Sequence, residues 1–307
     1  MMHVLVSSNR NYLRITVTML HSLYLSLGNE TVKVWFLCHE MPQSEREQFC
    51  KDVKFFCGYD VVFVEINSQM FASLQGPLYI KHISIETYFR LIAQFVLPTQ
   101  IDRILWLDCD LIIKGDIRKF YFQNLDNLAL VASVNTQDSM INLATVKRLN
   151  LPTDYLYFNA GVILFNLFYL REHTSLEYIL DYLAKHAHQL LLQDQDLLNM
   201  LYYERAKVLK DCKYNCIVNG VIKEKYKDVC DAVVIHYAGW QKPWKLRWQD
   251  EFSHYYWDIR RLEGLEWKER IVETFGKFLN KIHYNDFLRC VCAPYFWLRC
   301  RIKTVKK

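Results

Sequence analysis

The chain has 307 residues, of which 52% are apolar and 23% are charged, so a well-filled core is expected and global disorder is not. Its formal net charge of +5 is too small to indicate a nucleic-acid-binding protein. No stretch offers about 18 consecutive apolar residues, so we predict no transmembrane helix.

The cysteines favour a reducing compartment. There are ten of them, scattered along the chain, and the N-terminus lacks the basic, apolar and small-residue regions of a secretory signal. Cys212 and Cys216 have a spacing that zinc ligands can use, but no second pair lies nearby. We therefore expect reduced thiols in a cytoplasmic protein, which could sit peripherally on the inner face of the cell membrane.

Strands and helices alternate along the first 115 residues. Apolar runs predict strands at 3–7, 32–38, 61–66 and 103–113, and helical spacing predicts helices at 13–27, 43–57 and 85–97. The run from Arg103 to Ile113 is the strongest strand in the chain. This alternation predicts an α/β fold whose mixed, mostly parallel sheet is covered by helices on both faces.

The pattern changes near residue 245. Before it, strands are predicted at 128–134, 158–166 and 233–237, with helices at 175–192 and from about 194. After it come aromatic and charged helices at 249–262 and 267–281. We therefore place a catalytic domain at 1–245 and a helical, basic-aromatic extension at 246–307.

Asp108-Cys109-Asp110 ends the strongest strand. Two carboxylates in so apolar a run would be costly to bury without a partner. Mg²⁺ or Mn²⁺ typically uses one or two carboxylates together with substrate phosphate oxygens, and ligands bind at the carboxyl ends of parallel strands. The alternative is that the strand ends at Leu107 and the aspartates are solvated turn residues.

A second Asp-x-Asp motif, Asp194-Gln195-Asp196, precedes Leu197 and Leu198. These acids could simply favour the N-terminus of a helix through capping and the helix dipole. The other interpretation places carboxylates and a carboxamide beside a sugar hydroxyl or anomeric carbon.

Three further stretches combine groups that suit a ligand site. After the last strand, His236 could bind metal, Gly239 permits close backbone approach, and Lys242 offers a charge for phosphate. The small residues of 158–162 would let a ligand approach the backbone, unless they mark a β-bulge. In the stretch 82–90, Ser84 and Thr87 could be helix caps, and Arg90 could reach phosphate or an acid.

In this order, the five stretches resemble the family 8 retaining glycosyltransferases, with most similarity to bacterial lipopolysaccharide and lipooligosaccharide galactosyl- and glucosyltransferases. The resemblance covers roughly residues 1–245. It implies a GT-A (Rossmann-like) nucleotide-sugar-binding domain. It also implies Mn²⁺, or Mg²⁺ in its place, held by Asp108, Asp110 and His236.

The resemblance assigns further roles to single positions. Gly239 and Lys242 match diphosphate contacts, and Asp194 and Gln195 match sugar-binding and catalytic positions, with Gln195 under the reacting face of the anomeric carbon. The other implied donor-binding positions are Ser8, Asn9, Asn11, Tyr12, Arg90, Asp108, Cys109, Asn159 and Ala160.

Two positions depart from the family's pattern. Asn9 stands where the family commonly has an Asp that contacts uracil, although an Asn can still donate and accept hydrogen bonds there. Asn135 replaces an Asp that contacts the acceptor in some galactosyltransferases of the family, so the acceptor is less well defined than the donor.

The resemblance implies transfer of galactose or glucose from UDP-galactose or UDP-glucose, with retention, to a glycan acceptor. That acceptor would be lipid-linked, such as lipopolysaccharide or another cell-surface glycan, or alternatively protein-linked. Because Gln195 is a poor nucleophile, we favour same-face attack by the acceptor hydroxyl. A metal-dependent phosphohydrolase and a catalytically silent nucleotide-sugar-binding homologue are the rival hypotheses.

The segment 281–307 carries seven Lys or Arg residues against one acid, interleaved with aromatic side chains. Such a composition suits an anionic membrane surface, where aromatic rings lie at the headgroups and cations meet phosphates. The alternative is a helix that packs on the domain with a solvated basic end.

Overall fold

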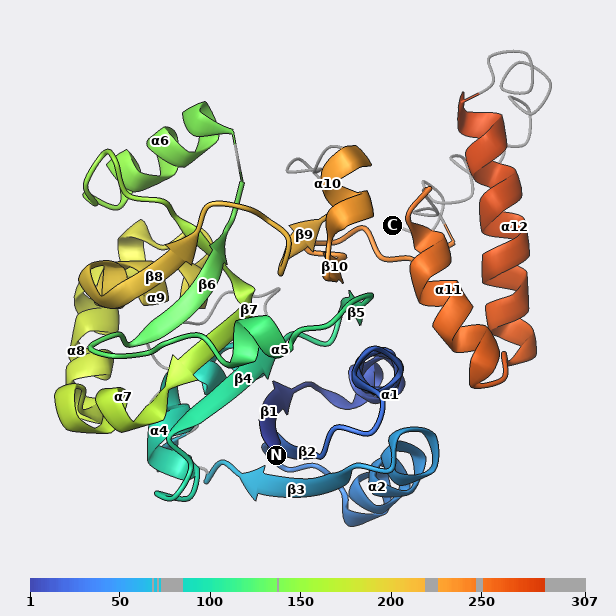
Figure 1. Cartoon of the computed structure of the whole chain (residues 1–307), viewed down its shortest axis with the longest axis horizontal. Coiled ribbons are helices and arrows are strands. Elements are labelled where there is room, and N and C mark those ends of the chain that lie inside the picture. Colours follow the sequence, from blue (N-terminus) through green and yellow to red (C-terminus); the bar gives the residue numbers. More distant parts are fainter. Residues whose placement is uncertain are drawn as a thin grey trace, which may run out of the picture. The chain divides into compact units, whose positions relative to one another are not determined.

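The computed structural model describes residues 1–67, 69–70, 72, 85–136, 138–218, 226–246 and 251–284. The chain forms two compact units, Met1–Ala238 and Gly239–Lys307 (Figure 1). The domain boundary predicted near residue 245 stays a prediction.

The first unit is built on a seven-stranded sheet in the order β3-β2-β1-β4-β7-β6-β8. Its strands are β1 (Met2–Ser7), β2 (Val32–Cys38), β3 (Asp60–Glu65), β4 (Arg103–Leu107), β6 (Leu130–Val134), β7 (Phe158–Asn166) and β8 (Ala206–Leu209). Within this sheet only β7 runs antiparallel to its neighbours. The predicted mixed, mostly parallel sheet is therefore confirmed.

A second, three-stranded sheet lies in the same unit, in the order β5-β10-β9. It consists of β5 (Leu111–Ile113), β9 (Cys216–Ile217) and β10 (Val234–His236), with β10 antiparallel to β5. The prediction of one strand over 103–113 is therefore wrong. The chain leaves the large sheet after Leu107 because β5 pairs with β10, and 108–110 form the turn between the two sheets.

Helices cover both faces of the large sheet (Figure 1). The helices in the described part of the first unit are η1 (Arg10–Tyr12), α1 (Leu13–Leu27), α2 (Gln43–Cys57), η3 (Ile85–Ile92), α4 (Ala93–Val96), α5 (Arg118–Tyr121), α6 (Ser139–Arg148), α7 (Leu167–His173), α8 (Leu176–His186), η4 (Ala187–Gln189), α9 (Gln193–Tyr202), η5 (Tyr203–Arg205) and α10 (Tyr226–Asp231). The helices predicted at 13–27 and 43–57 match α1 and α2.

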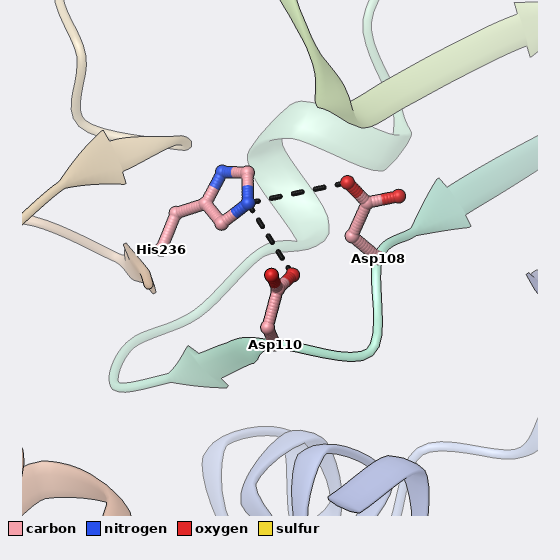
Figure 2. A group of neighbouring side chains, drawn as sticks. All are labelled: Asp108, Asp110 and His236. Atoms are coloured by element: carbon pink, nitrogen blue, oxygen red, sulfur yellow. Dashed lines mark ion pairs between the residues drawn. The ribbon is translucent and has the colours of Figure 1, made fainter. Parts of the chain in front are cut away.

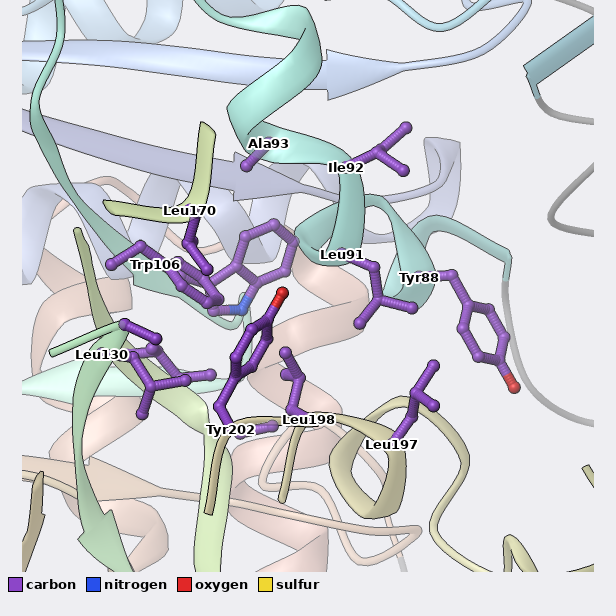
Figure 3. Packing of buried hydrophobic residues seen from close by; sticks show 14 of the residues in the cluster. Tyr88, Leu91, Ile92, Ala93, Trp106, Leu130, Leu170, Leu197, Leu198 and Tyr202 are labelled. Atoms are coloured by element: carbon purple, nitrogen blue, oxygen red, sulfur yellow. The ribbon is translucent and has the colours of Figure 1, made fainter. Parts of the chain in front are cut away.

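Successive residues of a strand point to opposite faces of the sheet, so they belong to two separate hydrophobic cores. Val4 and Phe36 belong to the core that holds the apolar residues of α1 and α2. Leu5 and Trp106 belong to the other core, with the apolar residues of α7, α8 and α9. Figure 3 shows Trp106 of β4 among Leu170 of α7 and Leu198 of α9.

Two predicted helices differ from the observed ones. The stretch 85–97 forms the 3₁₀ helix η3 followed by the short α4, instead of one α-helix. The helix predicted over 175–192 ends at His186, followed by η4. Asp196 accepts hydrogen bonds from the backbone N–H groups of Leu191 and Leu192, which holds this segment outside the helix.

The second unit contains α11 (Ser253–Leu262) and α12 (Trp267–Tyr284). The fully buried Arg260 joins them, because its guanidinium contacts Glu269 at 2.6 Å. No helix in the described ranges is long and apolar enough to span a membrane. Of the basic segment 281–307, residues 285–307 lie outside the described residues.

Candidate active site

Three predicted metal ligands converge at the turn between the two sheets. Asp108 follows β4, Asp110 precedes β5, and His236 is the last residue of β10 (Figure 2). The His236 Nε2 atom lies 3.4 Å from Asp110 Oδ1 and 3.9 Å from Asp108 Oδ2. One ligand atom from each residue lies within 4.8 Å of the others.

Backbone hydrogen bonds position these side chains. In the β5–β10 ladder, His236 pairs with Leu111, so the imidazole lies beside the turn. The Tyr237 N–H donates to the Asp110 carbonyl at 3.0 Å, and the Asp108 N–H donates to the Gly161 carbonyl on β7 at 2.9 Å. Strands from both sheets therefore hold the turn.

This donor set fits a divalent cation. Two carboxylates and one imidazole provide the oxygen and nitrogen ligands that Mn²⁺ accepts, and the carboxylates also suit Mg²⁺. The Asp108 and Asp110 side chains are 25% and 15% exposed, which leaves the carboxylates accessible to a ligand, whereas His236 is only 4% exposed. The metal role of these residues stays a prediction.

Arg90 on η3 connects the two Asp-x-Asp motifs. Its Nη2 contacts Asp108 Oδ1 at 2.9 Å and its Nε contacts Asp194 Oδ2 at 3.0 Å. The guanidinium also lies over the Trp106 ring, 4.5 Å from its centroid, and donates to the Ala160 carbonyl. Arg90 is 5% exposed, so this cation is held in place by both acids and by the ring.

The Asp194 carboxyl group of this cluster is buried. Burial raises its pKa to about 7, and the charge of Arg90 opposes that rise. The Asp194 carboxyl group is therefore balanced between its neutral and its charged form in the physiological pH range.

Gln195 belongs to the same region. Its Oε1 accepts from the Ala160 N–H at 3.0 Å, and its Nε2 donates to the Tyr157 hydroxyl at 3.0 Å and to Asn135 Oδ1 at 3.5 Å. Asn135 Oδ1 also accepts from Asn159 Nδ2 at 3.0 Å. The structure thus brings together the predicted sugar-binding residues and Asn135.

Asp196 has different surroundings. Its carboxylate is fully buried and pairs with Arg148 at 3.0 Å, and it accepts from the Tyr157 hydroxyl at 2.6 Å. Together with its bonds to the backbone of 191–192, these contacts give Asp196 a structural role.

The end of β1 lies against the same turn. The buried Cys109 thiol donates to the Ser7 carbonyl at 3.2 Å, and burial raises its pKa to about 12. Ser8 accepts from the Thr16 hydroxyl at 3.3 Å, and Asn9 Oδ1 accepts from the Asn11 N–H at 3.0 Å, which caps η1. Tyr12 follows as the cap of α1.

Gly239 and Lys242 belong to the second unit, and their diphosphate contacts stay a prediction. Gly239 has a φ of +78°, a conformation in which a side chain is strained, so a glycine suits this position. In the stretch 82–90, residues 82–84 lie outside the described residues.

A family model for glycosyl transferase family 8 matches residues 3–247. The chain belongs to glycosyltransferase family 8. The lipopolysaccharide 1,2-glucosyltransferase of Escherichia coli K12 is 34% identical over 231 residues, which cover 70% of this chain and 66% of that enzyme. General stress protein A of Bacillus subtilis is 23% identical, over 83% of this chain and 92% of that protein.

The fold of this family 8 chain also matches a solved structure. The galactosyltransferase LgtC, in complex with donor and acceptor sugar analogues, superposes with a TM-score of 0.74 at 21% identity, over 88% of this chain and 100% of that chain. The GT-A fold is thereby confirmed. The chain spans about half the length of several other curated relatives.

Two residues that contribute to the site, Asn215 and Tyr157, were not predicted from the sequence. Asn215 contacts His236, Tyr157 joins Gln195 to Asp196, and Gly161 lies beside the imidazole ring. Gly161 was singled out for ligand approach or a β-bulge, and the β6–β7 register indeed shifts between Ala132 and Val134. The other two carry no local signal of function.

Proposed function

We propose that the chain transfers a hexose, galactose or glucose, from a UDP-sugar to a glycan acceptor in a divalent-metal-dependent reaction that retains the anomeric configuration. The observation that carries this proposal is the convergence of Asp108, Asp110 and His236, with Arg90 joining this group to Asp194. This arrangement supports a diphosphate site next to a sugar site.

The protein groups divide the chemistry between them. Asp108, Asp110 and His236 would hold a divalent cation, which would supply positive charge for the leaving diphosphate, and we propose Mn²⁺ as the preferred ion. Lys242 is proposed to add a charge at the same phosphates. Ser8, Asn9, Asn11, Tyr12 and Cys109 are proposed to contact the nucleotide.

Gln195 is proposed to lie beneath the anomeric carbon as a hydrogen-bonding group. Both ends of its amide are engaged, with Ala160 and with Tyr157, which supports a fixed position. We therefore propose same-face attack: the bond from the anomeric carbon to phosphate breaks, the bond to the acceptor oxygen forms, and the acceptor proton passes to the leaving phosphate. Trapping of a stable glycosyl adduct on a carboxylate of the wild-type enzyme would contradict this route.

The acceptor is proposed to be a lipid-linked glycan such as lipopolysaccharide. The 34% identity to a lipopolysaccharide glucosyltransferase supports this choice over a protein-linked glycan. Asn135 lies next to Asn159 and Gln195, which supports a role for it in positioning an acceptor hydroxyl.

The test is UDP release from a panel of UDP-sugars, with Mn²⁺, Mg²⁺ or EDTA, and with or without a membrane glycolipid fraction. We expect release from UDP-galactose or UDP-glucose that requires Mn²⁺ and rises with the glycolipid fraction. Release that persists in EDTA, or no transfer from any UDP-sugar, would contradict the proposal.

We also propose that residues 281–307 bind an anionic membrane surface from the cytoplasmic side. Their seven basic residues and interleaved aromatic rings support this, at about 1 kcal/mol for each Lys or Arg near such a surface. Deletion of 285–307 is expected to abolish sedimentation with anionic vesicles and leave UDP release from soluble donor unchanged. Undiminished binding after the deletion would contradict this proposal.

A further inference from the structure

A chain of buried amide side chains runs from the candidate metal ligand His236 to the candidate sugar-binding residues. His236 Nδ1 lies 2.7 Å from Asn215 Oδ1, and Asn215 Nδ2 lies 2.8 Å from Asn159 Oδ1. Asn159 Nδ2 in turn lies 3.0 Å from Asn135 Oδ1. All four side chains belong to residues that are 6% exposed or less, so water does not compete for these bonds.

The backbone N–H of Gly161 determines which atom donates and which accepts in each hydrogen bond of this series of side chains. Its N–H can only donate, and it donates to the Asn159 side chain at 2.9 Å. The Asn159 atom that receives it must therefore be oxygen. That oxygen also faces Asn215, so the facing Asn215 atom must be the NH₂ nitrogen.

The same logic reaches the imidazole. Since the Asn215 nitrogen faces Asn159, its oxygen faces His236 Nδ1, and an acceptor there requires a proton on Nδ1. In a neutral imidazole the lone pair is then on Nε2, the atom that lies near Asp108 and Asp110. The tautomer of His236 is thus determined by a backbone N–H two side chains away.

We propose that Asn215 is a positioning residue that holds His236 in its Nδ1–H tautomer, so that the Nε2 lone pair faces the cation site. This inference rests on the proposed function only for the identity of the ligand that uses the lone pair. Partners of this kind typically change metal affinity by 10–100-fold when they are removed.

Gly161 contributes space as well as direction. A Cβ at this position would lie 2.8 Å from His236 Nδ1, closer than side chains tolerate. The carbonyl of the same residue accepts from the Asp108 N–H. A glycine at position 161 therefore lets the imidazole lie against β7 while its peptide groups orient both Asp108 and, through the amides, His236.

Two variants at position 215 separate the hydrogen bond to His236 from the hydrogen bond to Asn159. Asn215→Leu removes the acceptor for Nδ1, so we expect His236 to shift toward the Nε2–H tautomer and Mn²⁺ affinity to fall about 10–100-fold. Asn215→Asp keeps an acceptor for Nδ1 but places two acceptors face to face at Asn159. We expect it to retain the Nδ1–H tautomer and Mn²⁺ affinity to within about threefold, and to weaken donor binding at saturating Mn²⁺.

The tautomer is read directly by ¹⁵N NMR of the metal-free full chain with labelled histidine at about pH 8, where an ordinary imidazole is neutral. The His236 signals are identified by their loss in His236→Gln. Mn²⁺ affinity is measured by electron paramagnetic resonance without donor. Both readouts are independent of transfer activity, so they stand even if no UDP-sugar proves to be a substrate.

The matched control is Asn166→Leu, on the same strand as Gly161. Its side chain donates to the Leu125 and Leu128 carbonyls and caps α7, and it has no contact with His236 among the described hydrogen bonds. We expect Asn166→Leu to lose about as much stability as Asn215→Leu, while the His236 tautomer and the Mn²⁺ affinity stay as in the wild-type protein.

An Nε2–H tautomer in the wild-type protein would overturn the inference without any variant. So would an Asn215→Leu protein that keeps the Nδ1–H tautomer and Mn²⁺ affinity within about twofold of wild type, since a removed partner of this kind should cost at least tenfold. If Asn215→Leu does not fold, the wild-type tautomer and the Asn215→Asp variant still decide the question.

Discussion

The chain contains two Asp-x-Asp motifs with different geometry. Asp108 and Asp110 flank a turn between strands, and both carboxylates point to one place, beside His236 (Figure 2). Asp194 and Asp196 lie in the first turn of α9, where residues two apart point in different directions. Accordingly, Asp194 meets Arg90 and Asp196 meets Arg148.

The difference teaches that a short motif gains its chemistry from the backbone that carries it. In the turn, two acids share one site, which suits a cation from outside the chain. On the helix, each acid pairs with a different arginine, and the residue between them, Gln195, is the one that reaches the candidate sugar site.

Loss of one acid in the turn should have the largest effect. We expect Asp110→Asn to lower Mn²⁺-dependent transfer by about 10³-fold or more, because charge stabilisation of the leaving group depends on that site. Steady-state kinetics and direct Mn²⁺ binding check this. The matched control is Asp116→Asn, an exposed acid paired with Arg118. Equal loss in both variants would argue against a metal site in the turn.

Loss of the buried acid on the helix should affect folding instead. We expect Asp196→Asn to lower the free energy of unfolding by about 3 kcal/mol, because Arg148 is left without its buried partner. Urea denaturation measures the loss, and Mn²⁺ affinity should not change. The double variant Arg148→Met/Asp196→Asn should recover part of the stability. No recovery would mean that the ion pair is not the cause.

Gln195 lies between Asp194 and Asp196 on the helix. We expect Gln195→Ala to lower kcat by about 10²-fold, which is the cost of losing one hydrogen-bond donor to the transition state. Since Gln195 does not contact the turn in the hydrogen bonds described here, Mn²⁺ affinity should stay at the wild-type value. Gln48→Ala, on the surface of α2, is the control. If Gln195→Ala lowered only the Mn²⁺ affinity, the two motifs would not have the separate roles proposed for them.

The last prediction concerns pH. The Asp194 pKa of about 7 lies above the value near 3.9 of an unfolded Asp, so the folded chain retains a proton that the unfolded chain releases between about pH 4 and 7. Unfolding free energy should therefore fall with rising pH in that window and level off above it. The Asp194→Asn variant should lack this part of the pH dependence of the unfolding free energy. Parallel pH profiles of the two proteins would place the Asp194 pKa at its ordinary value.

The sequence predicts most of what local patterns determine. Apolar runs indicate β1, β2 and β7, which are almost entirely buried, and helical spacing indicates α1 and α2. The five stretches that carry the family resemblance include His236, Arg90 and Gln195, which the structure brings into two adjoining clusters.

What the sequence could not predict depends on partners far along the chain. Asp108 and Asp110 interrupt the apolar run of 103–113, but nothing in it shows that its last three residues pair with a strand more than a hundred positions later. Asn215 is one amide in a loop, and its role exists only because Gly161 and His236 lie beside it.

The β5–β10 ladder has a consequence for biosynthesis. Because His236 joins Asp108 and Asp110 only through this late strand, a growing chain that has not yet exposed β10 lacks one of the three ligands. Closing so long a loop is slow, since its entropy must be lost before the contact forms. Metal loading should accordingly follow completion of the first unit, and ribosome-bound or truncated chains that end before β10 should emerge without a complete cation site.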